Sequence, residues 1–127
     1  MTFIRLDKPY KHWKLLNDQT GDYLRIVPER GGLITSWNCK GNEMLYFDLD
    51  RFQDKDKSVR GGIPILFPIC GDLPNNQWQS PKGYLPMNQH GFARDIPWLI
   101  DHSQKDLSCL ITINHNNYTK KFYPFEF

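Results

Sequence analysis

The sequence predicts a mostly β fold, and three observations support this prediction. Short segments rich in aromatic and β-branched residues alternate with turn signals about every ten residues. The three-four spacing of apolar residues that marks an amphipathic helix is hard to find along the chain. A length of 127 residues allows one hydrophobic core and is too short for two, so we expect a single domain over residues 1–127.

Four strands are expected in the first half of the chain, over residues 13–16, 23–27, 33–39 and 43–47. Polar or glycine-containing segments separate them, and the connection at 40–42 has the length and the glycine of a hairpin turn. Residues 48–57 alternate acidic and basic side chains, which predicts a solvated loop or a single helical turn. A calcium loop is not expected there, because the central glycine and closing glutamate of an EF-hand are missing.

The second half begins with a long connection over residues 71–88, rich in proline, asparagine and glutamine. Long connections without secondary structure are uncommon in compact domains and often carry function. We expect this one to form a rim over a binding site, because it joins the two most distinctive segments of the chain. Three more strands are expected at 98–100, 108–114 and 122–127, with a polar turn at 114–119.

Composition excludes several classes of partner. Sixteen basic and fourteen acidic residues are interspersed and give a formal charge of +2, so we expect no nucleic-acid partner. Charged residues interrupt the N-terminal segment where a signal peptide needs an apolar run, and no stretch approaches the roughly 18 apolar residues of a membrane span. The three cysteines are far apart and suggest neither a disulfide framework nor a metal site. We therefore expect a cytoplasmic protein with reduced thiols and no membrane contact.

Two segments combine an arginine with glycines, prolines and aromatic residues. They are residues 60–68 (Arg-Gly-Gly-Ile-Pro-Ile-Leu-Phe-Pro) and 89–98 (Gln-His-Gly-Phe-Ala-Arg-Asp-Ile-Pro-Trp). Arginine supplies a planar fork of hydrogen-bond donors, while glycine and proline fix unusual backbone turns. This mixture suits a rigid polar pocket for an oxygen-rich or anionic small molecule. From these residue types alone, a surface arginine before a tight turn stays open as the alternative for Arg60.

The second segment brings together Gln89, His90 and Arg94. In extended backbone Gln89 and His90 face opposite sides, so a shared orientation requires the turn that Gly91 permits. A lone histidine in such surroundings is more often a hydrogen-bonded structural residue than a catalytic one. Trp98 can equally lie in the core or stack on a sugar ring.

Both segments resemble the galactose mutarotase-like or aldose 1-epimerase superfamily, and within it the hexose-6-phosphate mutarotase (glucose-6-phosphate 1-epimerase-like) branch. Members of that branch carry an Arg-Gly-Gly-Ile-Pro-x-x-Phe-Pro segment followed by a Gln-His-Gly-Phe-Ala-Arg segment, and both stand here in that order. A weaker resemblance covers residues 31–37, 43–46 and 123–127. The resemblance therefore extends over most of the chain.

The resemblance implies a partial antiparallel β-sandwich of the galactose mutarotase-like (supersandwich) kind, corresponding to the N-terminal part of that fold. It implies a hexose or hexose phosphate as ligand, no cofactor and no metal, with Arg60, Gln89 and Arg94 lining the substrate site and His90 supporting it. Mutarotation interconverts α and β anomers through ring opening and needs a general acid and a general base. In the family these are a histidine and a glutamate, and the resemblance places both beyond residue 127.

Three functions therefore stay open for this chain. It is an anomer-interconverting isomerase, a noncatalytic module that binds a sugar or sugar phosphate, or a truncated product without independent activity. None of Glu29, Glu43 and Glu126 has the sequence context of the family's base. A sandwich without its later strands exposes unpaired edges and an apolar face, so we expect either self-association or a compact smaller sandwich.

Overall fold

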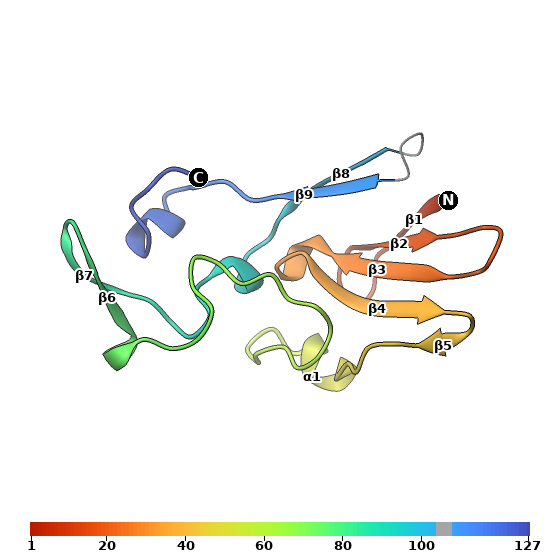
Figure 1. The fold of residues 1–127 in the computed structure, drawn as a ribbon, viewed down its shortest axis with the longest axis horizontal. Coiled ribbons are helices and arrows are strands. Elements are labelled where there is room, and N and C mark those ends of the chain that lie inside the picture. The colour runs from red at the N-terminus through yellow and green to blue at the C-terminus, as the bar shows by residue number, and fades with distance from the viewer. Residues whose placement is uncertain (104–107) are drawn as a thin grey trace.

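The computed structural model describes residues 1–103 and 108–127 of the chain. The described part consists mainly of antiparallel β structure with one short α-helix, as the sequence predicts. The molecule is elongated, with its largest sheet at one end and a small hairpin at the other (Figure 1). None of the described helices is long and apolar enough to cross a membrane.

The largest sheet contains five antiparallel strands in the order of the sequence. They are β1 (Thr2–Leu6), β2 (His12–Leu16), β3 (Tyr23–Val27), β4 (Leu33–Cys39) and β5 (Asn42–Glu43). The predicted strands at 13–16, 23–27 and 33–39 are confirmed, and the one at 43–47 is reduced to the two residues of β5. Strand β1 was not predicted. It pairs with β2 at the edge of the sheet, where the charged Arg5 faces solvent and discourages further strand addition.

A hairpin covers the more apolar face of this sheet. Its strands are β8 (Leu99–Ser103) and β9 (Ser108–Thr112). Phe3 and Leu15 are paired on neighbouring strands and therefore share this face. The ring of His102 stacks on Phe3 with 4.5 Å between centroids and meets Trp13 edge-on at 4.7 Å. These ring contacts hold the hairpin against this face of the sheet, and Figure 1 shows it beside strands β1 and β2.

The buried core on the opposite face is formed by Tyr10, Val27, Leu33 and Phe52. Phe52 belongs to helix α1 (Leu49–Gln53), the helical turn predicted within the charged segment. The side chain of Asp48 caps this helix by accepting a hydrogen bond from the Arg51 amide at 2.9 Å. Five residues alone are too few to form a stable helix. Burial of the Phe52 ring from the helix and of the Tyr10 ring from the sheet side therefore fixes α1 in place.

The prediction of an irregular connection at 71–88 is wrong for its second half. A 3₁₀ turn (Pro74–Asn76) leads into a hairpin of β6 (Gln77–Ser80) and β7 (Gly83–Pro86). Trp78 lies opposite Leu85 in the hairpin, and the Ser80 hydroxyl donates to the Gly83 carbonyl at 2.7 Å across the turn. Strands of four residues, the second of which contains glycine and proline, give a weak sequence signal, so this hairpin was not predicted.

The predicted strand at 122–127 is also wrong. A 3₁₀ turn (Thr119–Lys121) precedes it, and the Tyr123 amide donates back to the Thr119 carbonyl at 2.8 Å. Pro124 has no amide hydrogen for a strand ladder. The aromatic residues pack on the motif segment instead, with Phe127 4.9 Å from Phe67 between ring centroids. Aromatic spacing alone did not distinguish this side-chain cluster from a strand.

Candidate functional site

Three chain segments that are distant in sequence meet beside the core. They are the 3₁₀ turn Pro28–Arg30, residues 60–64, and the 3₁₀ turn Ala93–Asp95. The Gly31 amide donates to the Ile96 carbonyl at 3.1 Å, and the Trp98 amide donates to the Pro28 carbonyl at 2.9 Å. Ile34 and Ile63 exchange two backbone hydrogen bonds of 3.2 and 2.8 Å. These bonds set one arginine from each segment near the others.

Glycines at the junctions are required by close backbone packing. Gly31 has φ +70°, and a Cβ there would lie 2.3 Å from the Arg94 carbonyl oxygen. Gly62 has φ +69°, and its Cβ would lie 2.5 Å from the Ile34 carbonyl oxygen. In the structure, the close contact at Gly62 is with the main chain of β4.

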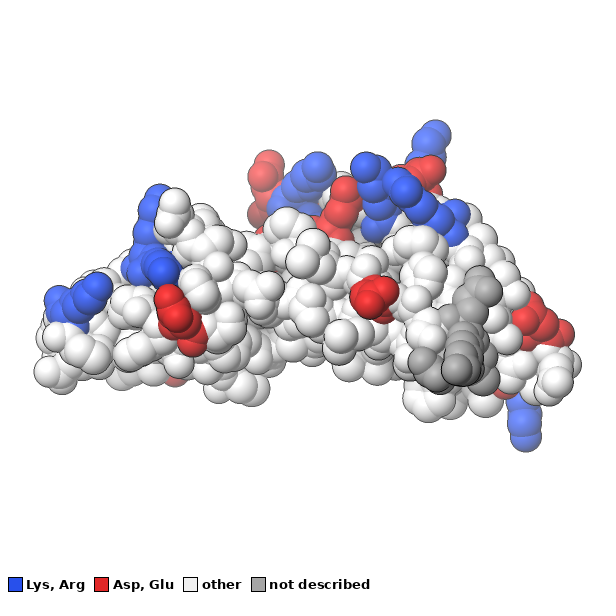
Figure 2. Space-filling model, turned by 90° about the horizontal axis from the view of Figure 1, so that it is seen from above, with Lys and Arg blue, Asp and Glu red and all other residues white. Residues whose placement is uncertain are grey.

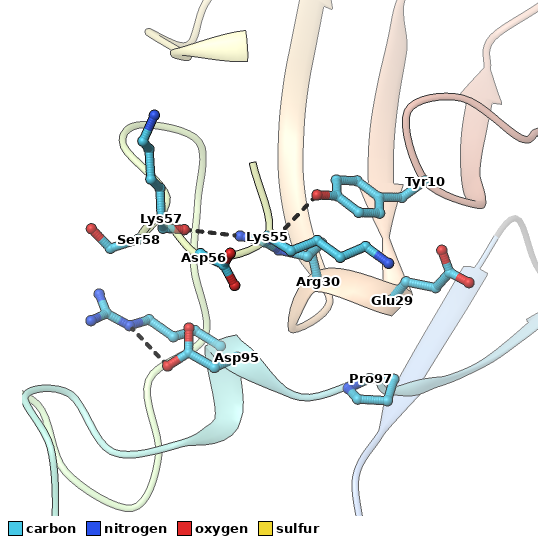
Figure 3. Close-up of a pocket in the computed structure, with 10 residues that line it drawn as sticks. Tyr10, Glu29, Arg30, Lys55, Asp56, Lys57, Ser58, Asp95 and Pro97 are labelled. Carbon is cyan, nitrogen blue, oxygen red and sulfur yellow. Dashed lines mark hydrogen bonds and ion pairs between the residues drawn. The ribbon is translucent and has the colours of Figure 1, made fainter. Parts of the chain in front are cut away.

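Two adjoining cavities open where these segments meet. The smaller has a volume of about 190 Å³ and is lined by Arg30, Gly31, Leu33, Val59, Arg60, Gly61, Gly62, Pro64 and Arg94. The larger, of about 600 Å³, lies between the charged loop after α1 and the segment that follows Arg94 (Figure 3). Arg30 and Arg94 line both cavities, so they stand at the boundary between them.

Arg94 is held by weak contacts that leave one donor unused. Its Nη2 donates to the Gln89 carbonyl at 3.4 Å, and its Nε lies 3.9 Å from a carboxylate oxygen of Asp95. The side chain is only 21% exposed, and the Nε is buried without a hydrogen-bond partner among the described residues. A buried donor without a hydrogen-bond acceptor costs free energy, and the Nε of Arg25, away from both cavities, is in the same situation.

The other two predicted site residues lie outside both cavities. The Gln89 side chain donates to Asp72 at 3.1 Å on the exposed side of the loop. His90 adopts φ +65° and is tied to Gly71 twice, since its amide donates to the Gly71 carbonyl at 2.8 Å and its Nδ1 accepts from the Gly71 amide at 2.9 Å. The structure therefore brings Arg60 and Arg94 to one cavity and gives His90 a loop-joining position.

Charges around the larger cavity are mixed. Lys57 pairs with Asp54 at 3.0 Å, and this hydrogen bond, with one from the Asp56 amide, lowers the pKa of the Asp54 carboxyl. Figure 2 shows acidic and basic side chains side by side, with a wide area of the viewed face free of both. Among the described residues no three His, Cys, Asp or Glu side chains are grouped as a metal ion needs.

Glu43 has a structural role in the β4–β5 hairpin. Its carboxylate accepts hydrogen bonds from the Trp37 and Leu45 amides at 2.8 and 3.1 Å and from the Ser36 hydroxyl. Burial raises the pKa of Glu43, but these hydrogen bonds outweigh it and hold the pKa below its ordinary value. An ionised carboxylate engaged in this way is poorly placed to accept a proton from a sugar.

Sequence reasoning missed Arg30. Its guanidinium donates to the Tyr10 hydroxyl and to the Lys57 carbonyl, each at 3.2 Å, and lines both cavities (Figure 3). A signal was present, because residues 30–32 repeat the Arg-Gly-Gly triplet of residues 60–62.

The antiparallel fold and the arginine-lined cavities define a mostly β protein with a candidate small-molecule site. The aldose 1-epimerase family model matches residues 14–127, and the chain belongs to that family.

Relatives with assigned names are similar over part of their length. The chain is 26% identical over 102 residues to a candidate glucose-6-phosphate 1-epimerase of Escherichia coli K12. The aligned region covers 77% of this chain and 32% of that protein. It is 37% identical over 78 residues to a candidate glucose-6-phosphate 1-epimerase of Cenchrus ciliaris, and this aligned region covers 61% of this chain and 20% of that protein. The chain thus spans a third or less of the length of these relatives.

Solved structures show the same fold. The Slr1438 protein of Synechocystis sp. PCC 6803 is 43% identical with a TM-score of 0.85, over 99% of this chain and 45% of that one. A galactose mutarotase related enzyme of Lactobacillus acidophilus is 25% identical with a TM-score of 0.71, over 91% of this chain and 36% of that one. The predicted mutarotase-like β fold is confirmed, and the chain corresponds to part of it.

Proposed function

We propose that this chain binds an aldose or its 6-phosphate at the two adjoining cavities, in the service of interconversion of the α and β anomers. The observation that carries this is the convergence of Arg60 and Arg94 on one cavity. Guanidinium groups donate charge-assisted hydrogen bonds to hydroxyl and phosphate oxygens. Gln89 stands beside this pair through its backbone contact with Arg94, and His90 supports the loop.

The two proton transfers of mutarotation are assigned to groups outside residues 1–127. Ring opening needs a base at the anomeric hydroxyl and an acid at the ring oxygen. Glu43 is engaged in its hairpin, and the side chain of Glu126 is 81% exposed beside His115. Glu29 lines the larger cavity, but its carboxylate accepts a hydrogen bond from the Lys11 amide at 3.0 Å. These engagements favour a second candidate for the isolated chain, a noncatalytic sugar or sugar-phosphate binding module.

Association and location form part of the same proposal. Leu99 and Leu110, one from each strand of the covering hairpin, are 68% and 61% exposed, and such apolar surface favours association with a second copy. Sedimentation at micromolar concentration is expected to show a species larger than the monomer, and a clean monomer contradicts this part. We place the protein in the cytoplasm, where sugar phosphates are made and used.

The site is tested by magnetisation-transfer NMR of anomer exchange in glucose 6-phosphate, together with titration of the same ligand. Arg60→Ala and Arg94→Ala are expected to weaken binding about ten- to a hundredfold, the value of a charge-assisted hydrogen bond. Arg5→Ala is the matched control, because Arg5 is an exposed arginine on β1 that pairs with Asp7 at 3.6 Å.

The outcomes separate the candidate functions. Saturable binding with accelerated exchange indicates the isomerase, and saturable binding alone indicates the binding module. No binding and no acceleration indicate a product without independent activity. Binding that survives both Arg60→Ala and Arg94→Ala unchanged refutes the proposed site.

A further inference from the structure

The two Arg-Gly-Gly triplets of the chain, residues 30–32 and 60–62, lie side by side in the structure. All four glycines have positive φ, between +65° and +87°. The antiparallel bridge between Ile34 and Ile63 joins the segments that follow the triplets. Arg30 and Arg60 therefore line the same 190 Å³ cavity, although they belong to different segments of the fold.

The smaller cavity differs from the larger one in the sign of its charge. Its charged lining consists of Arg30, Arg60 and Arg94, and none of the described residues that line it is acidic. The larger cavity is lined by the carboxylates of Glu29, Asp56 and Asp95 as well as by basic residues. Three like charges around one small space repel one another, and an anion with more than one negative charge relieves that repulsion.

Arg30 is held in place more firmly than the other two arginines. Its guanidinium donates one hydrogen bond to the Tyr10 hydroxyl and one to the Lys57 carbonyl, and both are drawn as dashed lines in Figure 3. The guanidinium carbon also lies 5.3 and 5.4 Å from the ring centroids of Tyr10 and Phe52. Tyr10 is itself fixed, since its hydroxyl donates to the Phe52 carbonyl at 3.0 Å. A guanidinium has five N–H donors, so these bonds leave donors for a ligand.

We infer that Arg30 is a third anion-binding residue of the site and that it selects a doubly charged phosphate monoester over the neutral sugar. This rests on the proposed function, because it assigns the smaller cavity to the phosphate. The hydroxyl-bearing remainder of the ligand then faces the larger cavity, where the carboxylates of Glu29 and Asp56 accept hydrogen bonds from hydroxyls. A neutral sugar has no charge to offset the repulsion among the arginines and gains little from Arg30.

The test compares two variants that each remove one positive charge. Arg30→Gln removes one of the three charges around the smaller cavity, and Arg5→Gln removes one charge from an exposed arginine that lines neither cavity. Calorimetric titrations use glucose 6-phosphate, glucose and inorganic phosphate as three separate ligands. Arg30→Gln is expected to weaken glucose 6-phosphate and phosphate by about tenfold or more, as for a lost charge-assisted hydrogen bond, and to leave glucose within about twofold. Arg5→Gln is expected to change each affinity by less than about threefold, because surface charges are screened by salt.

A structural effect of Arg30 is distinguished by the neutral ligand and by a second variant. Arg30→Lys keeps the charge and is expected to retain a preference for glucose 6-phosphate over glucose. Equal losses for both ligands in Arg30→Gln, or loss of that preference in a folded Arg30→Lys protein, overturn the assignment. If Arg60→Ala and Arg94→Ala weaken phosphate binding but Arg30→Gln does not, the role of Arg30 is refuted and the proposed function still stands. A wild-type chain that binds none of the three ligands refutes both this inference and the proposed function.

Discussion

Replacing Gly31 by alanine is expected to destabilise the protein because this glycine is where two parts of the site touch. An ideal Cβ at Gly31 lies 2.3 Å from the Arg94 carbonyl oxygen, about 1 Å closer than an ordinary contact of 3.4 Å. The added methyl must push the Arg94 segment away from the turn at Pro28–Arg30, and overpacking of this kind costs about 1–3 kcal/mol. The left-handed backbone, φ +70°, adds about 1–2 kcal/mol for a residue with a Cβ.

Gly21→Ala is the matched control for the backbone term. Gly21 has nearly the same φ, +78°, but a Cβ there meets nothing within 4 Å. Both variants place a residue with a Cβ at a left-handed backbone conformation, and only Gly31→Ala adds the clash with Arg94. The difference between them in free energy of unfolding is therefore expected to be about 1–3 kcal/mol.

Urea unfolding followed by tryptophan fluorescence measures this difference. With a slope of about 1–3 kcal/mol per molar urea, an extra 2 kcal/mol lowers the midpoint by roughly 1 M. Gly31→Ala is also expected to weaken glucose 6-phosphate binding, because Arg94 shifts within the cavity. Equal midpoints for Gly31→Ala and Gly21→Ala refute the claim that close packing requires glycine at this junction.

Two further predictions concern titrating groups. The lowered pKa of Glu43 means that its contribution to stability is present above the ordinary carboxyl pKa and is lost as pH falls through the lowered folded value. Glu43→Gln is therefore expected to unfold at lower urea at pH 7 and to lose less stability between pH 5 and acid pH. Burial, helped by the negative charge of Asp101, raises the pKa of the Cys109 thiol. Iodoacetamide at pH 8 is expected to alkylate exposed Cys70 before Cys109, and Asp101→Asn to speed alkylation of Cys109.

Each of these has a result that contradicts it. Glu126→Gln serves as the carboxylate control, since that side chain is 81% exposed, and it is expected to leave the urea midpoint at pH 7 unchanged. Equal pH dependence for Glu43→Gln and the wild type rules out the hairpin role of this carboxylate. Peptide mapping by mass spectrometry that finds Cys109 labelled as early as Cys70 contradicts the raised pKa.

Local sequence patterns predicted the regular part of the fold. The strands at 23–27 and 33–39 stand at the predicted bounds because alternating apolar residues and glycine turns act over short distances. The hairpin β6–β7 was not predicted because its strands are only four residues long and β7 contains glycine and proline, and the strand at 122–127 was predicted wrongly because aromatic residues serve a side-chain cluster equally well. Pairing partners decide such cases, and they lie far away in the sequence.

The sequence by itself determined the β class, the family and the two segments that carry Arg60 and Arg94, because each of these is written in contiguous residues. Only the tertiary structure decided which side chains share a cavity. It placed Arg30 with that pair, tied His90 to Gly71, and turned the Gln89 side chain away toward Asp72. The reason is physical. The cavity is formed by close backbone contacts of Gly31 with Arg94 and of Gly62 with Ile34, which join segments about 60 and about 30 residues apart, and no local pattern encodes such contacts.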